Sequence, residues 1–139
     1  MELGERVIMN REILFKAKRK DNGEWVEGNL ITNERNENQK YIGYIFDERN
    51  GMIEDFDLVE VIPETLCQYT GLTDKNIWEN DIVRNEKGDI GVVQWFEEHA
   101  AFMIWNKTKN CVCYLAENDF SKIEVIGNIF DNAELLEVK

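Results

Sequence analysis

The feature that most constrains this fold is an alternation of apolar and polar side chains with a period of two, interrupted by turn-forming residues. Near the start, one face of an extended segment carries Ile13, Phe15 and Ala17, and the other carries Glu12, Lys16 and Lys18. The triplet Asp21-Asn22-Gly23 then marks a turn, and the alternation resumes over 25–31. We therefore predict a β-hairpin in this part of the chain.

Further short apolar runs, each bounded by turn residues, predict a mainly β protein. The predicted strands are 41–46, 56–62, 82–83, 90–96, 100–105, 111–115 and 124–130. Residues 32–40 are polar and lack aromatic side chains, so we expect a solvated loop there. The runs 90–96 and 100–105 are apolar at consecutive positions, which indicates strands covered on both faces or a sheet curled into a small barrel. Asp131 and Asn132 predict a capped helical turn near the end.

The net charge of the chain limits the kinds of molecule that it can bind. The chain has a net charge of −12, and all of the excess lies in residues 41–139, because residues 1–40 carry equal numbers of acids and bases. Such a surface repels the nucleic-acid backbone, so we expect no direct nucleic-acid binding. Its electrostatic partner is a basic protein surface or a cation.

No run of about 18 apolar residues is present, and no positively charged leader precedes an apolar segment. We therefore expect a cytoplasmic protein with no membrane partner. Met9 stands just before the alternation begins, and we expect residues 1–8 to be a non-native or disordered leader. Residues 9–63 form the predicted N-terminal β region, and residues 64–139 form the second region, with the seam at Pro63.

Reactive residues are few. Cys67, His99, Cys111 and Cys113 are four soft ligands, but their spacing lacks the paired Cys-x-x-Cys of a structural zinc site. We expect reduced thiols, no metal and no cofactor. The single histidine follows two glutamates in a predicted turn, with no nucleophile near it in sequence, and no glycine-rich phosphate loop is present. We therefore predict a protein that is not an enzyme.

One local cluster is basic, and it consists of Lys16, Lys18, Arg19 and Lys20. Charged residues at the end of a strand usually form a solvated edge that discourages aggregation. The same cluster can instead contact the acidic surface of a second subunit, which predicts a head-to-tail homo-oligomer.

Three segments resemble one family of bacteriophage proteins. Arg11-Glu12-Ile13-Leu14-Phe15-Lys16-Ala17 resembles the opening of the YopX family. Gln68-Tyr69-Thr70-Gly71-Leu72-Thr73-Asp74-Lys75-Asn76, followed by Glu79-Asn80-Asp81-Ile82-Val83, resembles its central motif. Val125-Ile126-Gly127-Asn128-Ile129-Phe130-Asp131-Asn132 resembles its close. Asn80 stands where the family has glycine, and asparagine tolerates the left-handed conformation that such a turn requires.

The resemblance implies a mainly β fold with an SH3-like small barrel over 64–139, and an origin in a phage or prophage of a bacterial host. It implies no activity, because the family has no established biochemical role. We therefore predict a non-enzymatic accessory protein that binds another protein and acts as a homo-oligomer. The alternative is an acidic nucleic-acid mimic that blocks a host DNA-binding protein. Tyr69, Asp74 and Asp81 of the central motif join the basic cluster as predicted partner-binding residues.

Overall fold

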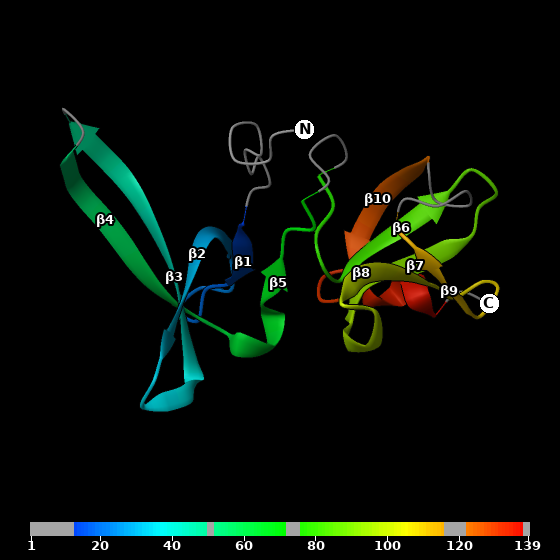
Figure 1. The fold of residues 1–139 in the computed structure, drawn as a ribbon, viewed down its shortest axis with the longest axis horizontal. Coiled ribbons are helices and arrows are strands. Elements are labelled where there is room, and N and C mark those ends of the chain that lie inside the picture. Colours follow the sequence, from blue (N-terminus) through cyan, green and yellow to red (C-terminus); the bar gives the residue numbers. More distant parts are fainter. Residues whose placement is uncertain (1–12, 50–51, 72–75, 116–121, 138–139) are drawn as a thin grey trace, which may run out of the picture.

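The computed structural model describes residues 13–49, 52–71, 76–115 and 122–137. These residues form two antiparallel sheets of five strands each, and Figure 1 shows the sheets side by side with β5 between them. The first sheet has the order β4-β3-β2-β1-β5, built from Phe15–Lys18 (β1), Trp25–Asn33 (β2), Asn36–Arg49 (β3), Met52–Val61 (β4) and Cys67–Gln68 (β5). The second has the order β10-β6-β7-β8-β9, built from Asp81–Asn85 (β6), Ile90–Phe96 (β7), Ala101–Asn106 (β8), Cys111–Tyr114 (β9) and Ile123–Asn128 (β10).

The predicted first hairpin is confirmed, since β1 pairs with β2 and Ala17 lies opposite Val26. The solvated loop predicted over 32–40 is wrong. β2 and β3 pair almost to their ends, with Thr32 opposite Lys40 and a two-residue turn at Glu34 and Arg35. The pairing is made by the backbone, so polar side chains that face solvent do not interrupt it.

Each sheet buries one apolar cluster. In the first sheet the buried cluster consists of Ala17, Ile42, Val59 and Val61. In the second it consists of Ile77, Val83, Val93, Ile104 and Leu115. Alternate residues of a strand face opposite sides, so the buried neighbours Val92 and Val93 on β7, like Met103 and Ile104 on β8, show that both faces of the second sheet are covered at its centre.

The second sheet is an open meander in the part of the chain described. β10 returns to pair with β6, and β9 and β10 are the two ends of the strand order. The mainly β class is therefore confirmed, whereas closure into an SH3-like barrel stays a prediction. No helix in the described residues is long and apolar enough to span a membrane.

In the described part of the chain, the short 3-10 helices Pro63–Thr65 (η1) and Glu97–His99 (η2) connect strands, and Ala133–Leu136 (η4) follows β10. The helical turn predicted near the end is confirmed as η4. Its predicted cap is wrong, because Asn132 makes no side-chain bond to the first turn. The Asn132 side chain instead accepts a hydrogen bond from the Asn128 N–H, at 3.1 Å.

Candidate functional site

A third buried cluster joins the two sheets, and we call it the junction. It contains Cys67, Tyr69 and Trp78, with Leu14, Trp25 and Phe130 packed against it. Tyr69 and Trp78 form an isolated β-bridge, and their ring centroids are 5.2 Å apart. Tyr69, which follows β5, and Trp78, which precedes β6, therefore meet within the junction.

Three of the predicted partner-binding residues lie in the junction. Lys16 places its Nζ 4.8 Å from the ring centroid of Trp78 and 5.0 Å from that of Trp25. Tyr69 is buried against Trp78. Asp81 is only 4% exposed, and its Oδ2 accepts a hydrogen bond of 2.8 Å from the Trp78 N–H.

Burial raises the pKa of Asp81 to about 6, against the opposing effects of the Trp78 N–H and the Lys16 ammonium. Because the Asp81 carboxylate is held by a backbone amide, it fixes the path of the chain into β6. Asp74, the other carboxylate of the central motif, lies outside the described residues.

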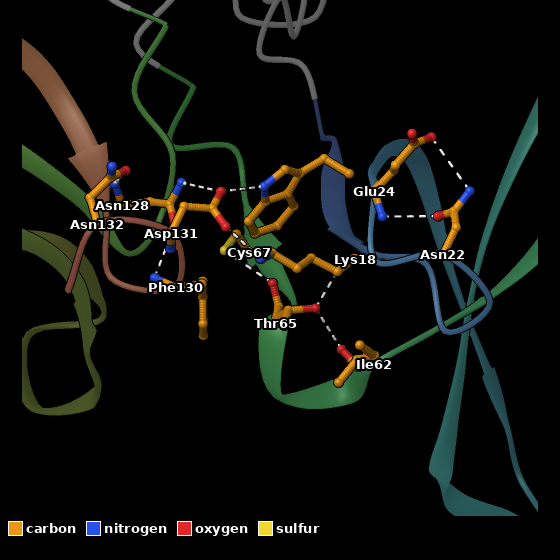
Figure 2. Close-up of polar contacts among 11 residues, drawn as sticks. Lys18, Asn22, Glu24, Ile62, Thr65, Cys67, Asn128, Phe130, Asp131 and Asn132 are labelled. Carbon is orange, nitrogen blue, oxygen red and sulfur yellow. Dashed lines mark hydrogen bonds and ion pairs between the residues drawn. The ribbon is translucent and has the colours of Figure 1, made fainter.

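The rest of the basic cluster pairs with acids of the same chain. Lys18 forms an ion pair with Asp131, and Figure 2 shows these two side chains pointing toward one another. Arg19 pairs with Asp21 at 2.9 Å. Lys20 pairs with Glu60 at 3.3 Å. A role of this cluster in contacting another subunit stays a prediction, and such contacts would have to compete with these pairs.

A compact loop delivers Asp131 to Lys18. The Asn128 Oδ1 accepts hydrogen bonds from the N–H groups of Phe130 and Asp131, each at 2.9 Å. A Cβ added to Gly127 would lie 2.5 Å from the Asn132 side chain, so the loop closes over a glycine. The segment that resembles the family's close therefore consists of the end of β10 and a loop, and Asp131 of this loop docks onto the first sheet.

Asp131 contacts two residues of the first sheet. Besides the ion pair with Lys18, its Oδ2 accepts a hydrogen bond of 2.8 Å from the Trp25 indole N–H. The Lys18 bond, followed by the Trp25 bond, lowers the pKa of Asp131 to about 2. The sequence analysis did not identify this contact, because its partners are more than one hundred residues apart.

Asn80 confirms one prediction from the sequence. Its φ is 71°, the left-handed conformation expected where the family has glycine. Its N–H donates to the Val93 carbonyl at 2.7 Å, and its own carbonyl accepts from the Ile129 N–H at 3.1 Å. Asn80 therefore links the segment that leaves the junction to β7, through Val93, and to the residue that follows β10, Ile129.

A groove of about 710 Å³ opens between the two sheets, and we call it the inter-sheet groove. It is lined by Phe15, Pro63, Leu66, Gln68, Tyr69, Thr70, Glu79, Trp95, Ala100, Ala101 and Phe102. Trp95 is 46% exposed and packs edge-on against Phe102, with ring centroids 5.1 Å apart. Among these residues Glu79 is the one carboxylate, and none is a lysine, arginine or histidine.

The outward surface of the first sheet carries a second candidate surface. Its members are Ile31, Ile45, Phe56 and Leu58, which we call the outer apolar face, and each is more than 40% exposed. Ile45 lies opposite Phe56 in the register, and Leu58 lies opposite Gly43. A Cβ added to Gly43 would lie 2.9 Å from Ile31 and 3.6 Å from Leu58, so these two side chains nearly meet over the glycine. The four side chains therefore lie on one face of β2, β3 and β4.

The potential metal ligands are distributed over different elements. Cys67 is buried in the junction, His99 is exposed in η2, and Cys111 and Cys113 lie on β9. None of the three cysteines forms a disulfide. Within the described ranges, no three His, Cys, Asp or Glu side chains lie close enough together to hold a metal ion.

Comparison with protein families gives a match over nearly the whole chain. The model of the YopX protein family matches residues 14–137, which include the junction, the inter-sheet groove and the outer apolar face. The curated proteins contain no match to this chain.

Proposed function

The chain belongs to the YopX family, and from this premise we propose that it is a non-enzymatic protein-binding module that acts as a homo-oligomer. Its setting in this proposal is the cytoplasm of a bacterial host, with the gene carried by a phage or prophage. The observation that carries the proposal is the outer apolar face. Contiguous apolar side chains with a polar rim are typical of surfaces that bind other proteins.

The register of the first sheet supports a second copy of the chain as the occupant of this face. Phe56 is 64% exposed and lies beside Ile45 in the long hairpin of β3 and β4, which extends away from the second sheet in Figure 1. Asp55 and Glu60 place acids on β4, the edge strand, so pairing β4 with its own copy would oppose like charges. Face-to-face packing of two identical apolar faces avoids this repulsion and gives a closed two-fold dimer.

The same proposal treats the buried Asp81 carboxyl group as structural, and the backbone contact of Glu79 as part of the same crossing. Asp81 accepts the Trp78 N–H, and Glu79 accepts the Gln68 N–H at 3.1 Å. Both bonds lie where the chain crosses from β5 to β6. The proposal also retains an SH3-like architecture for the second sheet, since a meander whose last strand returns to its first is the arrangement that a small barrel requires.

The test is the mass of the protein in solution, measured by light scattering coupled to size exclusion. We expect the wild type to form dimers or larger closed assemblies, and Phe56→Asp to elute with the mass of one chain while retaining its far-UV spectrum. Val125→Asp is the matched control, because Val125 is exposed on β10 and lies outside the outer apolar face. A monomeric wild type, or an unchanged mass for Phe56→Asp, would refute the proposal.

An acidic nucleic-acid mimic is the second candidate. The observation that favours it is the excess of acids: Lys18, Arg19 and Lys20 are paired within the chain, which leaves an uncompensated negative surface. A mimic would compete with DNA for a basic DNA-binding protein, and its binding would weaken steeply with salt. Binding that resists 0.5 M salt and depends on Phe56 would favour the protein-binding module.

A further inference from the structure

The inter-sheet groove contains a carboxylate without a cation. Glu79 is half-buried, and burial raises the pKa of its carboxyl group, with the Gln68 N–H acting in the opposite direction. None of the ion pairs among the described residues includes Glu79. A carboxylate taken out of water without a counter-ion is costly, and a cationic ligand would relieve that cost.

The position of Glu79 is fixed by the backbone. The Glu79 N–H donates to the Gln68 carbonyl at 2.9 Å, and the Gln68 N–H donates back to the Glu79 Oε1. This reciprocal pair holds the side chain at the wall of the groove and engages one of its two oxygens. The second oxygen is left as an acceptor for a ligand.

The junction provides an internal precedent for the same chemistry. There Lys16 stacks on Trp78, and its charge acts on the buried Asp81 carboxylate. The inter-sheet groove repeats the indole and the carboxylate with Trp95 and Glu79, and no lysine among the described residues lines it. The aliphatic stem of a lysine or arginine packs well on an aromatic face, and its charged end is attracted to the ring.

From this arrangement we propose that the inter-sheet groove binds a lysine or arginine side chain presented by an extended segment of a partner protein. Glu79 is the counter-ion, and Trp95 with Phe102 forms the wall for the aliphatic stem. A groove of about 710 Å³ exceeds the volume of one side chain, and Gln68 and Thr70 add polar groups along it, so the neighbouring residues of a peptide also fit.

This inference deepens the proposed function, because it names the chemistry of the partner. It rests on the proposed function in one respect, that the protein acts by binding another protein. The residues of the groove and those of the outer apolar face do not overlap. Self-association and peptide binding can therefore fail separately. The titration below is repeated in Phe56→Asp, in which the groove is unchanged, so that loss of one activity is not mistaken for loss of the other.

The test is a titration of isotope-labelled protein, followed by nuclear magnetic resonance, with the blocked tripeptide Leu-Arg-Leu. Its matched probe replaces arginine by citrulline, which has the same shape and no charge. The resonance of the Gln68 backbone amide is the reporter, because this N–H donates a hydrogen bond directly to the Glu79 carboxylate. We expect saturable shifts of the Gln68 amide and of the Trp95 indole with the arginine peptide, and at least tenfold weaker binding of the citrulline peptide.

Two variants assign the effect. Glu79→Gln removes the charge but keeps an acceptor for the Gln68 N–H, and we expect it to reduce the affinity for the arginine peptide at least tenfold. Glu134→Gln is the control, since it removes one charge from an exposed residue of η4, outside the groove. If Glu79→Gln does not fold, the affinities of the wild-type protein for the arginine and citrulline peptides still test whether the charge is required for binding.

Three results would overturn the proposal. The Gln68 amide could fail to move with the arginine peptide. The citrulline peptide could bind as tightly as the arginine peptide. Free butylguanidinium could bind as tightly as the tripeptide, which would assign the groove to a small cation and not to a protein segment.

Discussion

Among individual residues, Asp81 is a carboxylate whose environment differs strongly from water. It is 4% exposed, and its pKa is raised to about 6 by burial, from an ordinary value of 3.8. In the unfolded chain it releases its proton near pH 4, whereas the folded chain holds the proton until about pH 6. Between these values the folded chain binds more protons, so the contribution of Asp81 to stability falls as pH rises.

The first prediction follows from this sign. Asp81→Asn should raise the free energy of unfolding at pH 7 by about 1 to 3 kcal/mol, since two pKa units correspond to about 3 kcal/mol. It should also reduce the fall in stability between pH 4 and pH 6. Urea unfolding at several pH values measures both effects.

Asp55→Asn is the control for Asp81→Asn, because Asp55 is exposed on β4. Glu79, whose pKa burial also raises, adds a dependence of the same sign, so Glu79→Gln is measured in parallel. A destabilised Asp81→Asn whose pH dependence matches the wild type would contradict the assignment.

Gly28 shows how closely β2 and β3 approach. A Cβ at this position would lie 2.5 Å from the Gly43 carbonyl oxygen and 2.9 Å from the Ile42 side chain. The oxygen belongs to the backbone, so it cannot rotate away. The side chain at position 28 is therefore limited to hydrogen.

The second prediction is that Gly28→Ala lowers the free energy of unfolding by about 1 to 3 kcal/mol, the usual cost of forcing a methyl group into a packed core. Asn29→Ala is the control on the neighbouring exposed position. Thermal unfolding followed by circular dichroism measures both. Equal midpoints for the two variants would show that the strands can separate at no cost.

At the scale of elements, the loop from Asn128 to Asn132 joins the two sheets. Its Asp131 carboxylate accepts bonds from Lys18 and from the Trp25 indole, and Trp25 also packs on Phe130 with ring centroids 6.0 Å apart. The hydrogen bonds inside the loop fix Asp131 before it meets the first sheet. The docking therefore depends on the loop as a unit.

The third prediction is that Asp131→Ala destabilises the protein by about 1 to 2 kcal/mol, the sum expected for one hydrogen bond and one partly exposed ion pair. The emission of Trp25 should also shift toward longer wavelength as water reaches the indole. Because the pKa of Asp131 is lowered to about 2, its contribution is present above the ordinary value of 3.8 and is lost as pH falls toward 2.

Asp21→Ala is the control for Asp131→Ala, since Asp21 pairs with Arg19 in the β1–β2 turn and does not connect the sheets. A loss of stability as large in Asp21→Ala as in Asp131→Ala would refute a specific role for the loop. Equilibrium urea unfolding and fluorescence spectra provide the two measurements.

The sequence predicted the elements better than it predicted the contacts between them. Alternation and turn residues located the hairpins, because these signals act over a few residues. The strand at 36–40 was missed, since its polar side chains resemble those of a loop. Glu79 was quoted within the central motif but not identified as a candidate, because the groove that it lines with Trp95 and Phe102 is formed only by the tertiary fold.

For the whole molecule, the junction decides whether the two sheets unfold together. Its buried cluster takes residues from both, and β5 pairs with β1 although it follows Pro63 in the sequence. The division into regions 9–63 and 64–139 stays a prediction from the sequence, which does not decide whether the two regions are independent domains. The shared core indicates that neither region buries its apolar surface alone.

The fourth prediction is a single cooperative transition. Far-UV circular dichroism, which reports both sheets, and tryptophan fluorescence, which includes Trp25 and Trp78 in the junction, should give the same urea midpoint. A fragment of residues 64–139 should lack a cooperative transition. Two separated midpoints, or a fragment that unfolds cooperatively, would show that the sheets are independent.

The docking of Asp131 on Lys18 and Trp25 also has a consequence during synthesis. A ribosome synthesises the strands of the first sheet before it reaches residue 131. Trp25 therefore lacks its hydrogen-bond acceptor, Asp131, until that residue has been added. A messenger RNA truncated after codon 128 would encode every strand of both described sheets but would lack Asp131 and its contacts with Lys18 and Trp25. Such a product would be a good substrate for proteases, and the cell could thereby distinguish finished copies from unfinished ones.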